Sequence, residues 1–277
     1  MVCDHLPMTR IALIRKVFHA DPDGSLLRQS LVEAKELGAS IAVLPELPLN
    51  AWSPASRVPC EEDAELVSGA RVRQQSHAAA SVGIGLVGGA IIRDDTGIRR
   101  NTALVFGPDG TLLDTYAKCH IPDEPGFRES DHYDAGASFA RPVHGLELPI
   151  GIQICSDANR PQGTQVLASL GAELVVVPRA TEKATWHRWK PVLQASALTC
   201  CCYVASVNRP SPENGVLIGG PSFAVDPTGK ILIESEEDIT VFDVDRSSMD
   251  THRSMYPGYI SVRSDLYADA WSEVRDQ

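Results

Sequence analysis

The chain has 277 residues, of which 43% are hydrophobic and 22% charged, which is ordinary for a globular protein with one large core or two small domains. Its formal net charge of −11 argues against nucleic acid or an anionic membrane as the main partner, although local charge in a cleft can still attract an anionic small molecule. The sequence has no run of about 18 apolar residues, so we expect no membrane-spanning helix.

The first half of the chain alternates strand-like and helix-like patterns. Leu27, Leu31 and Ala34 recur at helical spacing in the first helical segment. A long irregular segment, 119–146, closes this half, and irregular segments of that length are usually functional. The predicted elements are strands at 10–17, 40–45, 84–92, 102–106 and 111–116, and helices at 25–37 and 62–81.

The second half repeats this alternation. The predicted elements are strands at 147–154, 173–177, 202–207, 221–226, 230–235 and 239–244, helices at 161–170 and 186–199, and a short helix at 245–254. The tail, 255–277, looks extended. Because composition does not shift along the chain, we predict a single α/β domain over residues 1–277, with two layers of strand and helices outside them.

Three ionisable residues each follow a strand-like run. Glu46 follows the second predicted strand, Lys118 the last strand of the first half, and Cys155 the first strand of the second half. Ligands of α/β sheets bind at such strand ends, where an acid, a cation and a thiol can serve as proton carrier, oxyanion partner and nucleophile. Lys118 and the start of helix 161–170 should favour the thiolate of Cys155. The plainer interpretations are a solvated carboxylate, a surface lysine and a buried structural thiol.

The same three residues stand in longer motifs. Glu46 lies in "LPEL", Lys118 in "YAKCHIP" and Cys155 in "ICSD". With these motifs in this order, the chain resembles the nitrilase, or carbon–nitrogen hydrolase, superfamily over nearly its whole length. The stretch "KCHIPDEPGFRE" is similar to the branch that hydrolyses N-carbamoyl amines and linear amides. The resemblance implies a four-layer αββα sandwich.

The resemblance also implies roles for individual residues. Cys155 would be the nucleophile, Glu46 the general base and acid, and Lys118 the cation that faces the oxyanion. Glu129 matches the family's second glutamate and would orient Lys118 and the substrate. The backbone N–H of Ser156, next to the nucleophile, is the natural second oxyanion donor.

Three further residues lie near these motifs. His120 matches a histidine often found two residues after the lysine, and we expect it to support the structure rather than transfer protons. Arg160 and Arg179 stand where many family members carry other residues, and two arginines at the mouth of the site suggest a carboxylate or other anion in the substrate. The alternative is that both arginines form structural salt bridges.

The expected reaction is cysteine-dependent hydrolysis of a linear amide or N-carbamoyl compound, with or without a carboxylate, through a thioester. One alternative is hydrolysis of a nitrile through a thioimidate, and another is a non-catalytic binding or scaffold protein. We expect no cofactor and no metal, because no Cys/His spacing resembles a zinc site. The match to G-x-G-x-x-G at 83–88 lies inside a strand-like run, which argues against a dinucleotide site.

Cysteine usage and the tail suggest a compartment and an assembly. The seven cysteines are an odd number, three of them consecutive at 200–202, which fits a reducing compartment better than a disulfide framework. The first eight residues lack the apolar core of a signal peptide, so we expect a cytoplasmic protein. Tyr256, Tyr259 and Tyr267 would be costly to leave exposed, so we predict that the tail makes contacts in a homodimer or higher homo-oligomer.

Overall fold

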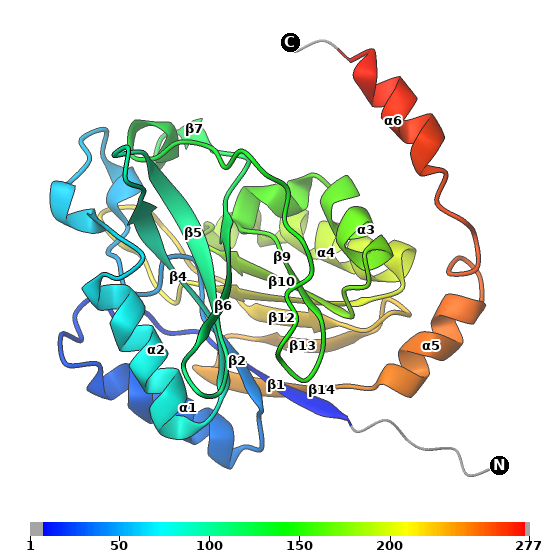
Figure 1. The fold of residues 1–277 in the computed structure, drawn as a ribbon, viewed down its shortest axis with the longest axis horizontal. Helices are drawn as coiled ribbons and strands as arrows, with labels where there is room; N and C mark the ends of the chain where they lie inside the picture. The colour runs from blue at the N-terminus through cyan, green and yellow to red at the C-terminus, as the bar shows by residue number, and fades with distance from the viewer. Residues whose placement is uncertain (1–7, 275–277) are drawn as a thin grey trace.

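Two β-sheets pack face to face, and a pair of helices covers the outer side of each sheet (Figure 1). The structure is a computed structural model that describes residues 8–274. This arrangement is the four-layer αββα sandwich expected from the sequence.

The first sheet has the strand order β14-β1-β2-β4-β5-β6, with a short β3 paired to β4. Its strands are β1 (Thr9–Ile14), β2 (Ile41–Val43), β3 (Ala64–Glu65), β4 (Gly85–Arg93), β5 (Arg99–Phe106), β6 (Leu112–Ala117) and β14 (Ile239–Val244). The central strands β1, β2 and β4 run parallel, whereas β5, β6 and β14 join in antiparallel pairs.

The second sheet has the order β13-β12-β11-β10-β9. Its strands are β9 (Ile150–Ile152), β10 (Leu174–Arg179), β11 (Tyr203–Asn208), β12 (Ser222–Val225) and β13 (Ile231–Ser235). Strands β9, β10 and β11 are parallel, so their carboxyl ends share one edge of the sheet.

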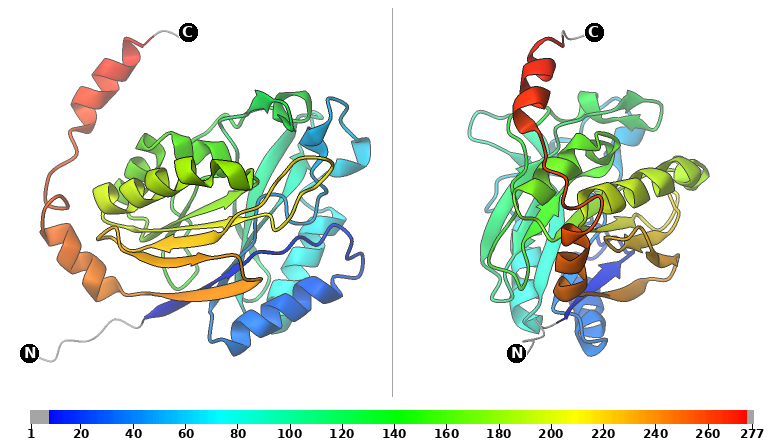
Figure 2. Two further views of the ribbon diagram at one scale, coloured as in Figure 1. Left: turned by 180° about the vertical axis from the view of Figure 1, so that it is seen from behind. Right: turned by 90° about the vertical axis from the view of Figure 1, so that its right-hand side faces the viewer.

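Alternation along the strands builds the layers. Ile11 and Leu13 of β1 face the core between the two sheets, whereas Ala12 and Ile14 face the helix layer. That layer consists of α1 (Ser25–Glu36) and α2 (Ala70–Val82), and the opposite layer consists of α3 (Gln162–Ser169) and α4 (Trp186–Cys200). Figure 2 shows the two helix pairs on opposite sides of the strands.

The predicted helix at 62–81 began too early. Residues 61–65 form a 3-10 turn (Glu61–Asp63) followed by β3, and α2 begins only at Ala70. The carboxylate of Glu65 accepts a hydrogen bond from the backbone N–H of Val72 at 2.9 Å, which satisfies a free donor in the first turn of the helix. Glu65 therefore lies outside the helix whose start it stabilises.

The tail is partly helical rather than extended. After α5 (Arg246–Ser254) the chain leaves the body and forms α6 (Ser264–Ser272), which Figures 1 and 2 show at the end of an arm. Leu266, Tyr267 and Trp271 are all more than half exposed. Residues 275–277, the end of the predicted tail, lie outside the described part of the chain.

The irregular segment 119–146 holds a two-stranded hairpin, β7 (Asp123–Glu124) and β8 (Phe127–Arg128), and then a 3-10 turn (Glu129–Asp131).

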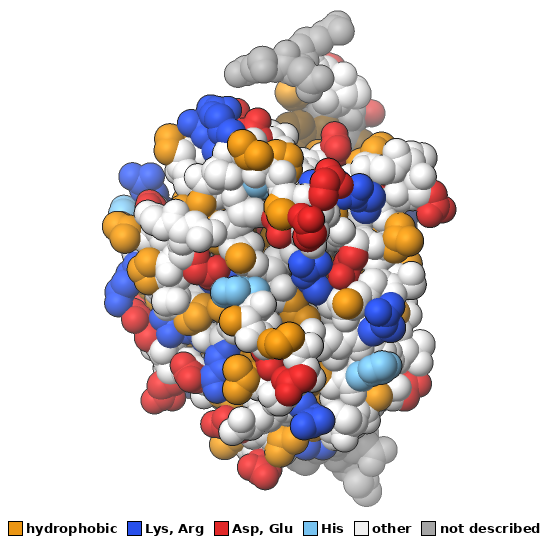
Figure 3. Space-filling view, turned by 90° about the vertical axis from the view of Figure 1, so that its left-hand side faces the viewer, with side chains coloured by type: hydrophobic (Ala, Val, Ile, Leu, Met, Phe, Trp, Pro, Cys, Tyr) orange, Lys and Arg blue, Asp and Glu red, His pale blue; other side chains and the backbone are white. Residues whose placement is uncertain are grey.

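Between residues 8 and 274, no helix combines the length and apolar character needed to cross a membrane. On the face shown in Figure 3, acidic and basic side chains are interspersed.

Candidate active site

Two carboxylates and an ammonium group meet in the interior, beyond the ends of β2 and β6. Lys118 Nζ donates to Glu46 Oε1 at 2.8 Å and to Glu129 Oε1 and Oε2 at 2.8 and 2.7 Å. All three side chains are almost fully buried. Glu46 lies just beyond β2, Lys118 directly follows β6, and Glu129 begins the 3-10 turn after β8. The structure therefore brings together three of the residues selected from the sequence.

Burial and charge set the protonation of this cluster. Burial lowers the pKa of Lys118, but attraction to Glu129 and Glu46 outweighs burial, so its pKa lies above the ordinary lysine value. Burial raises the pKa of Glu129, and Glu46 raises it further against the opposing effect of Lys118. Lys118 is thus a fixed cation between two acids.

Two neighbours of this cluster were not identified from the sequence. Asn101 Nδ2 donates to Glu46 Oε1 at 2.7 Å, and the Tyr133 hydroxyl donates to Glu129 Oε2 at 2.8 Å. The second oxygen of Glu46, Oε2, is buried and has no hydrogen-bond partner among the described residues. Tyr133 stands four residues after Glu129, a spacing that could have signalled the contact.

Cys155 starts the 3-10 turn Cys155–Asn159, which follows β9. Its φ of 47° lies in the left-handed region, an uncommon and strained backbone for a residue other than glycine. Its thiol donates a weak hydrogen bond to the Ala180 carbonyl at 3.7 Å. The sharp turn holds the sulfur at the end of the strand.

The surroundings of Cys155 oppose the expected thiolate. Burial raises the pKa of Cys155 well above the ordinary thiol value, Glu46 raises it further, and Lys118 opposes this only in part. Lys118 is already paired with two carboxylates, so its positive charge does not offset the effects of burial and Glu46 on the pKa of Cys155. Burial and Glu46 therefore favour the thiol form of Cys155 over the thiolate.

Asp157 joins the Lys118 segment to the Cys155 turn. Its Oδ1 accepts hydrogen bonds from the backbone N–H groups of Cys119 and His120, at 3.2 and 3.0 Å, and lies 2.7 Å from His120 Nδ1. Its Oδ2 accepts from the Tyr116 hydroxyl at 2.9 Å. His120 thus contacts the carboxylate of Asp157, and its supporting role stays a prediction.

A cavity of about 290 Å³ opens beside Cys155. It is lined by Pro122, Glu124, Phe127, Glu129, Cys155, Ser156, Asn159, Ala180, Thr181, Glu182, Thr185, Arg188 and Trp189. The backbone N–H of Ser156 makes no hydrogen bond to any other described residue, so it can donate to a ligand. The cavity therefore offers a thiol, a free N–H and the edge of the buried charge cluster.

The two arginines expected at the mouth do not line this cavity. The side chain of Arg160 is exposed and donates only to the neighbouring Asn159 carbonyl, at 3.3 Å, within the described chain. Arg179 is fully buried; its guanidinium donates to Ser206 Oγ and Thr181 Oγ1, both at 2.8 Å, and to the Pro221 carbonyl, and it stacks on a tryptophan ring. Arg179 thus serves the structure through hydrogen bonds rather than salt bridges. The arginine that does line the cavity is Arg188.

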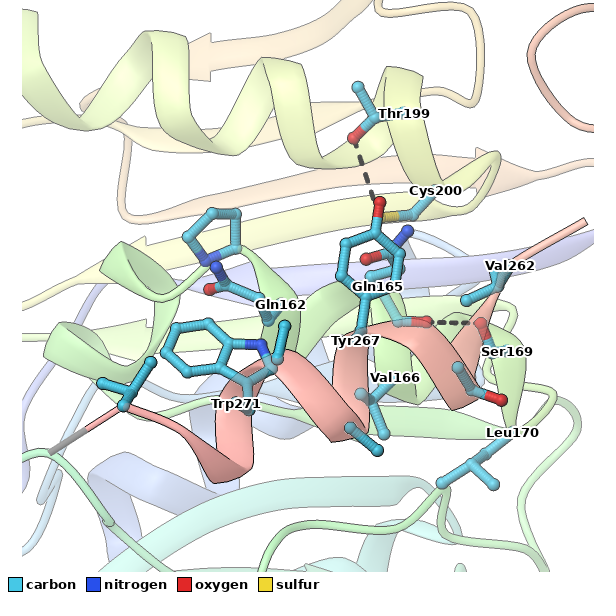
Figure 4. A pocket seen from close by; sticks show the side chains of 15 residues that line it. Gln162, Gln165, Val166, Ser169, Leu170, Thr199, Cys200, Val262, Tyr267 and Trp271 are labelled. Carbon is cyan, nitrogen blue, oxygen red and sulfur yellow. Dashed lines mark hydrogen bonds between the residues drawn. The ribbon is translucent and has the colours of Figure 1, made fainter. Parts of the chain in front are cut away.

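A larger pocket of about 850 Å³ lies between α6 and the surface of α3 and α4. In Figure 4 the rings of Tyr267 and Trp271 reach from α6 toward α3 and the end of α4. Most of its wall is apolar, and no carboxylate, lysine, arginine or histidine of residues 8–274 lines it. This pocket therefore has none of the acid–base chemistry found around Cys155.

Known proteins resemble this chain in sequence and in fold. The profile of the family described as carbon-nitrogen hydrolase matches residues 14–254. The chain is 33% identical over 273 residues to the omega-amidase NIT2 of Homo sapiens, covering 94% of this chain and 96% of that protein. Among solved structures, a carbon-nitrogen hydrolase from Helicobacter pylori G27 superposes with a TM-score of 0.87 at 22% identity, covering 96% of this chain and 99% of the other. A double mutant of an amidase from Nesterenkonia sp. AN1, in complex with acrylamide, superposes with a TM-score of 0.79 at 22% identity, covering 95% and 97%.

Proposed function

Since the chain belongs to the carbon–nitrogen hydrolase family and its relatives include amidases, it is a hydrolase of amide C–N bonds, and we propose that Cys155 carries out this hydrolysis as a nucleophile on a small linear amide. The observation that carries the proposal is the buried contact of Lys118 with Glu46 and Glu129 beside the cavity that exposes Cys155. An N-carbamoyl compound presents the same kind of carbonyl carbon to the thiol.

The first half of the reaction forms a thioester. Glu46 takes the proton from the Cys155 thiol as the sulfur attacks the amide carbon, and the C=O electron pair moves onto oxygen. The Ser156 N–H donates a hydrogen bond to this oxyanion, and the Lys118 ammonium stabilises it electrostatically. When the tetrahedral intermediate collapses, the C–N bond breaks, Glu46 returns its proton to the departing nitrogen, and ammonia or an amine leaves.

The second half releases the acid. Glu46 takes a proton from water as the water oxygen attacks the thioester carbon, giving a second oxyanion in the same place. Collapse breaks the C–S bond, and the proton on Glu46 returns to sulfur. Since Oε2 of Glu46 has no partner among the described residues, it is the oxygen free to carry this proton.

The test of this function is release of ammonia from short primary amides, with intact-protein mass spectrometry in parallel. Wild-type protein should show an acyl adduct during turnover, and Cys155→Ala should show neither adduct nor ammonia. Full activity in Cys155→Ala would overturn the cysteine mechanism.

A nitrile is the alternative substrate, because the same sulfur can add to a C≡N carbon and give a thioimidate. Amide and nitrile partners of one carbon skeleton separate the two reactions. Faster turnover of the nitrile than of the matched amide would replace the amidase assignment with a nitrilase.

We propose further that α6 packs against a second copy of the chain. Residues 259–274 are all exposed, although they include aromatic and aliphatic side chains. The facing surface of α3 also exposes apolar side chains, at Val166 and Leu170. Apolar surface on both walls of one groove supports a homo-oligomeric contact rather than a solvated arm.

A further inference from the structure

Three charged side chains on the wall of the Cys155 cavity are not used by the proposed chemistry. Glu124 comes from β7, Glu182 follows β10, and Arg188 lies in the first turn of α4. None of these three side chains has a hydrogen-bond or ion-pair partner within residues 8–274.

The free guanidinium contrasts with arginines elsewhere in the fold. Arg179 and Arg209 are buried, and each places its guanidinium nitrogens on oxygen acceptors. Arg188 instead is an exposed residue that lines the cavity, and its planar fork of donors is not used by any described residue. A guanidinium in this position is suited to a carboxylate, which it can bind through two parallel hydrogen bonds.

The two unpaired carboxylates restrict the ligand further. A substrate with only a negative charge would satisfy Arg188 but would be repelled by Glu124 and Glu182. A substrate with only a positive charge would satisfy a carboxylate but would be repelled by Arg188. Only a ligand that carries both charges offers an opposite charge to Arg188 and to the carboxylates at the same time.

We propose that the cavity selects a linear amide whose far end carries both a carboxylate and an ammonium group, as in the head group of an α-amino acid. Arg188 binds the carboxylate, and Glu182, assisted by Glu124, binds the ammonium. This inference rests on the proposed amide hydrolysis at Cys155. The cavity volume of about 290 Å³ fits a compact head group on a short carbon chain better than an aromatic or long-chain amide.

The test compares four primary amides that share a four-carbon amide chain and differ in the charged groups attached to its far carbon. L-Glutamine carries both charges, glutaramic acid only the carboxylate, 4-aminobutanamide only the ammonium, and butanamide neither. Ammonia release gives kcat/KM for each. The set is repeated with one methylene fewer, starting from L-asparagine, so that chain length does not decide the result.

Wild type should turn over the zwitterionic amide best. Arg188→Gln should lower kcat/KM for the two carboxylate-bearing amides by at least about tenfold relative to the two without a carboxylate, the effect of losing a charge-assisted hydrogen bond. Glu182→Gln should give the mirror pattern, with the ammonium-bearing amides losing most. Arg160→Gln, which removes an exposed arginine outside the cavity, is the matched control and should not change the ranking.

The outcomes separate this inference from the function on which it rests. Equal losses for all four amides in Arg188→Gln, or a wild-type preference for an amide with one charge or none, would overturn the head-group assignment and leave amide hydrolysis intact. Turnover of no amide by wild type, or full turnover by Cys155→Ala, would overturn the proposed function itself. Thermal melting of each variant shows whether a loss comes from unfolding.

Discussion

Glu46 and Lys118 share a hydrogen bond of 2.8 Å through a single carboxylate oxygen, Oε1, and the other oxygen of Glu46 is left buried and without a partner in the described chain. Asn101 donates to the same Oε1. Both donors therefore fix the orientation of the carboxylate without occupying the oxygen that can take a proton. This division suits a group that must hold its geometry while it exchanges protons.

The first prediction concerns that proton carrier. Glu46→Gln keeps the shape of the side chain but cannot accept the Cys155 proton, so kcat should fall by roughly two to four orders of magnitude. Steady-state ammonia release measures the loss. Asn101→Asp removes the hydrogen bond to Glu46 and places a third carboxylate near Lys118, so it should also slow turnover. Activity of Glu46→Gln within a few-fold of wild type would assign the proton transfer to another group.

The second prediction concerns the buried cation. Lys118→Ala should lower kcat by about two to three orders of magnitude, the usual effect of removing one group that stabilises the oxyanion. It should also lower the free energy of unfolding by about 3–5 kcal/mol, because Glu46 and Glu129 lose their partner in the interior. Urea unfolding and kinetics measure the two effects separately.

Lys118→Arg tests whether charge alone suffices. A planar guanidinium does not replace a compact ammonium between two carboxylates, so we expect partial recovery of stability and poor recovery of kcat. If Lys118→Ala raised only KM, the residue would bind ground-state substrate and not the oxyanion.

The third prediction concerns pH. The pKa of Cys155 is raised by burial and by Glu46, so the proton stays on sulfur at pH values where an exposed thiol has lost it. Alkylation of Cys155 by iodoacetamide requires the thiolate, so its rate should keep rising with pH beyond the ordinary thiol pKa of about 8.5. Peptide mass spectrometry follows the modification of this one residue. A rate that levels off below neutral pH would show that the resting sulfur is already a thiolate.

The fourth prediction concerns Asp157. Asp157→Asn replaces one acceptor oxygen by a donor group, so one side of the contact between the Lys118 segment and the Cys155 turn is lost. The free energy of unfolding should fall by about 1–3 kcal/mol, and kcat should fall because both segments shift. Tyr116→Phe, which removes one hydrogen bond to Asp157, should have a smaller effect on both. An unaltered kcat in a destabilised Asp157→Asn would limit Asp157 to stability.

The fifth prediction concerns assembly. If α6 packs against a second copy, light scattering of wild type should give at least twice the chain mass of 29.9 kDa. Replacing Tyr267 and Trp271 together by Ser should shift the mass to that of one chain. Val58→Ser, an exposed apolar side chain on another part of the surface, should not. A wild-type mass of one chain at micromolar concentration would reject the assembly.

Local sequence patterns were enough to locate most elements and the strand ends at which the candidate site residues stand. The alternation of strand and helix predicted the layers, and β14 and α4 appear almost as predicted. Glu46, Lys118 and Cys155 each follow a strand, and this relation depends only on neighbours in the chain. Such features are predictable because hydrophobic periodicity and strand ends are short-range properties.

The tertiary structure alone decided which charged side chains face the cavity. Arg160 and Arg179 have suitable positions in the sequence, yet one points to solvent and the other is enclosed, while Arg188 reaches the cavity from the first turn of α4. The contact of Asn101 with Glu46 and the raised pKa of Cys155 likewise depend on groups far apart in the chain. The sequence by itself determined the residue types and the strand ends at which they stand. Side-chain direction, burial and the field of neighbouring charges were decided only by packing, because they depend on which surfaces meet in three dimensions.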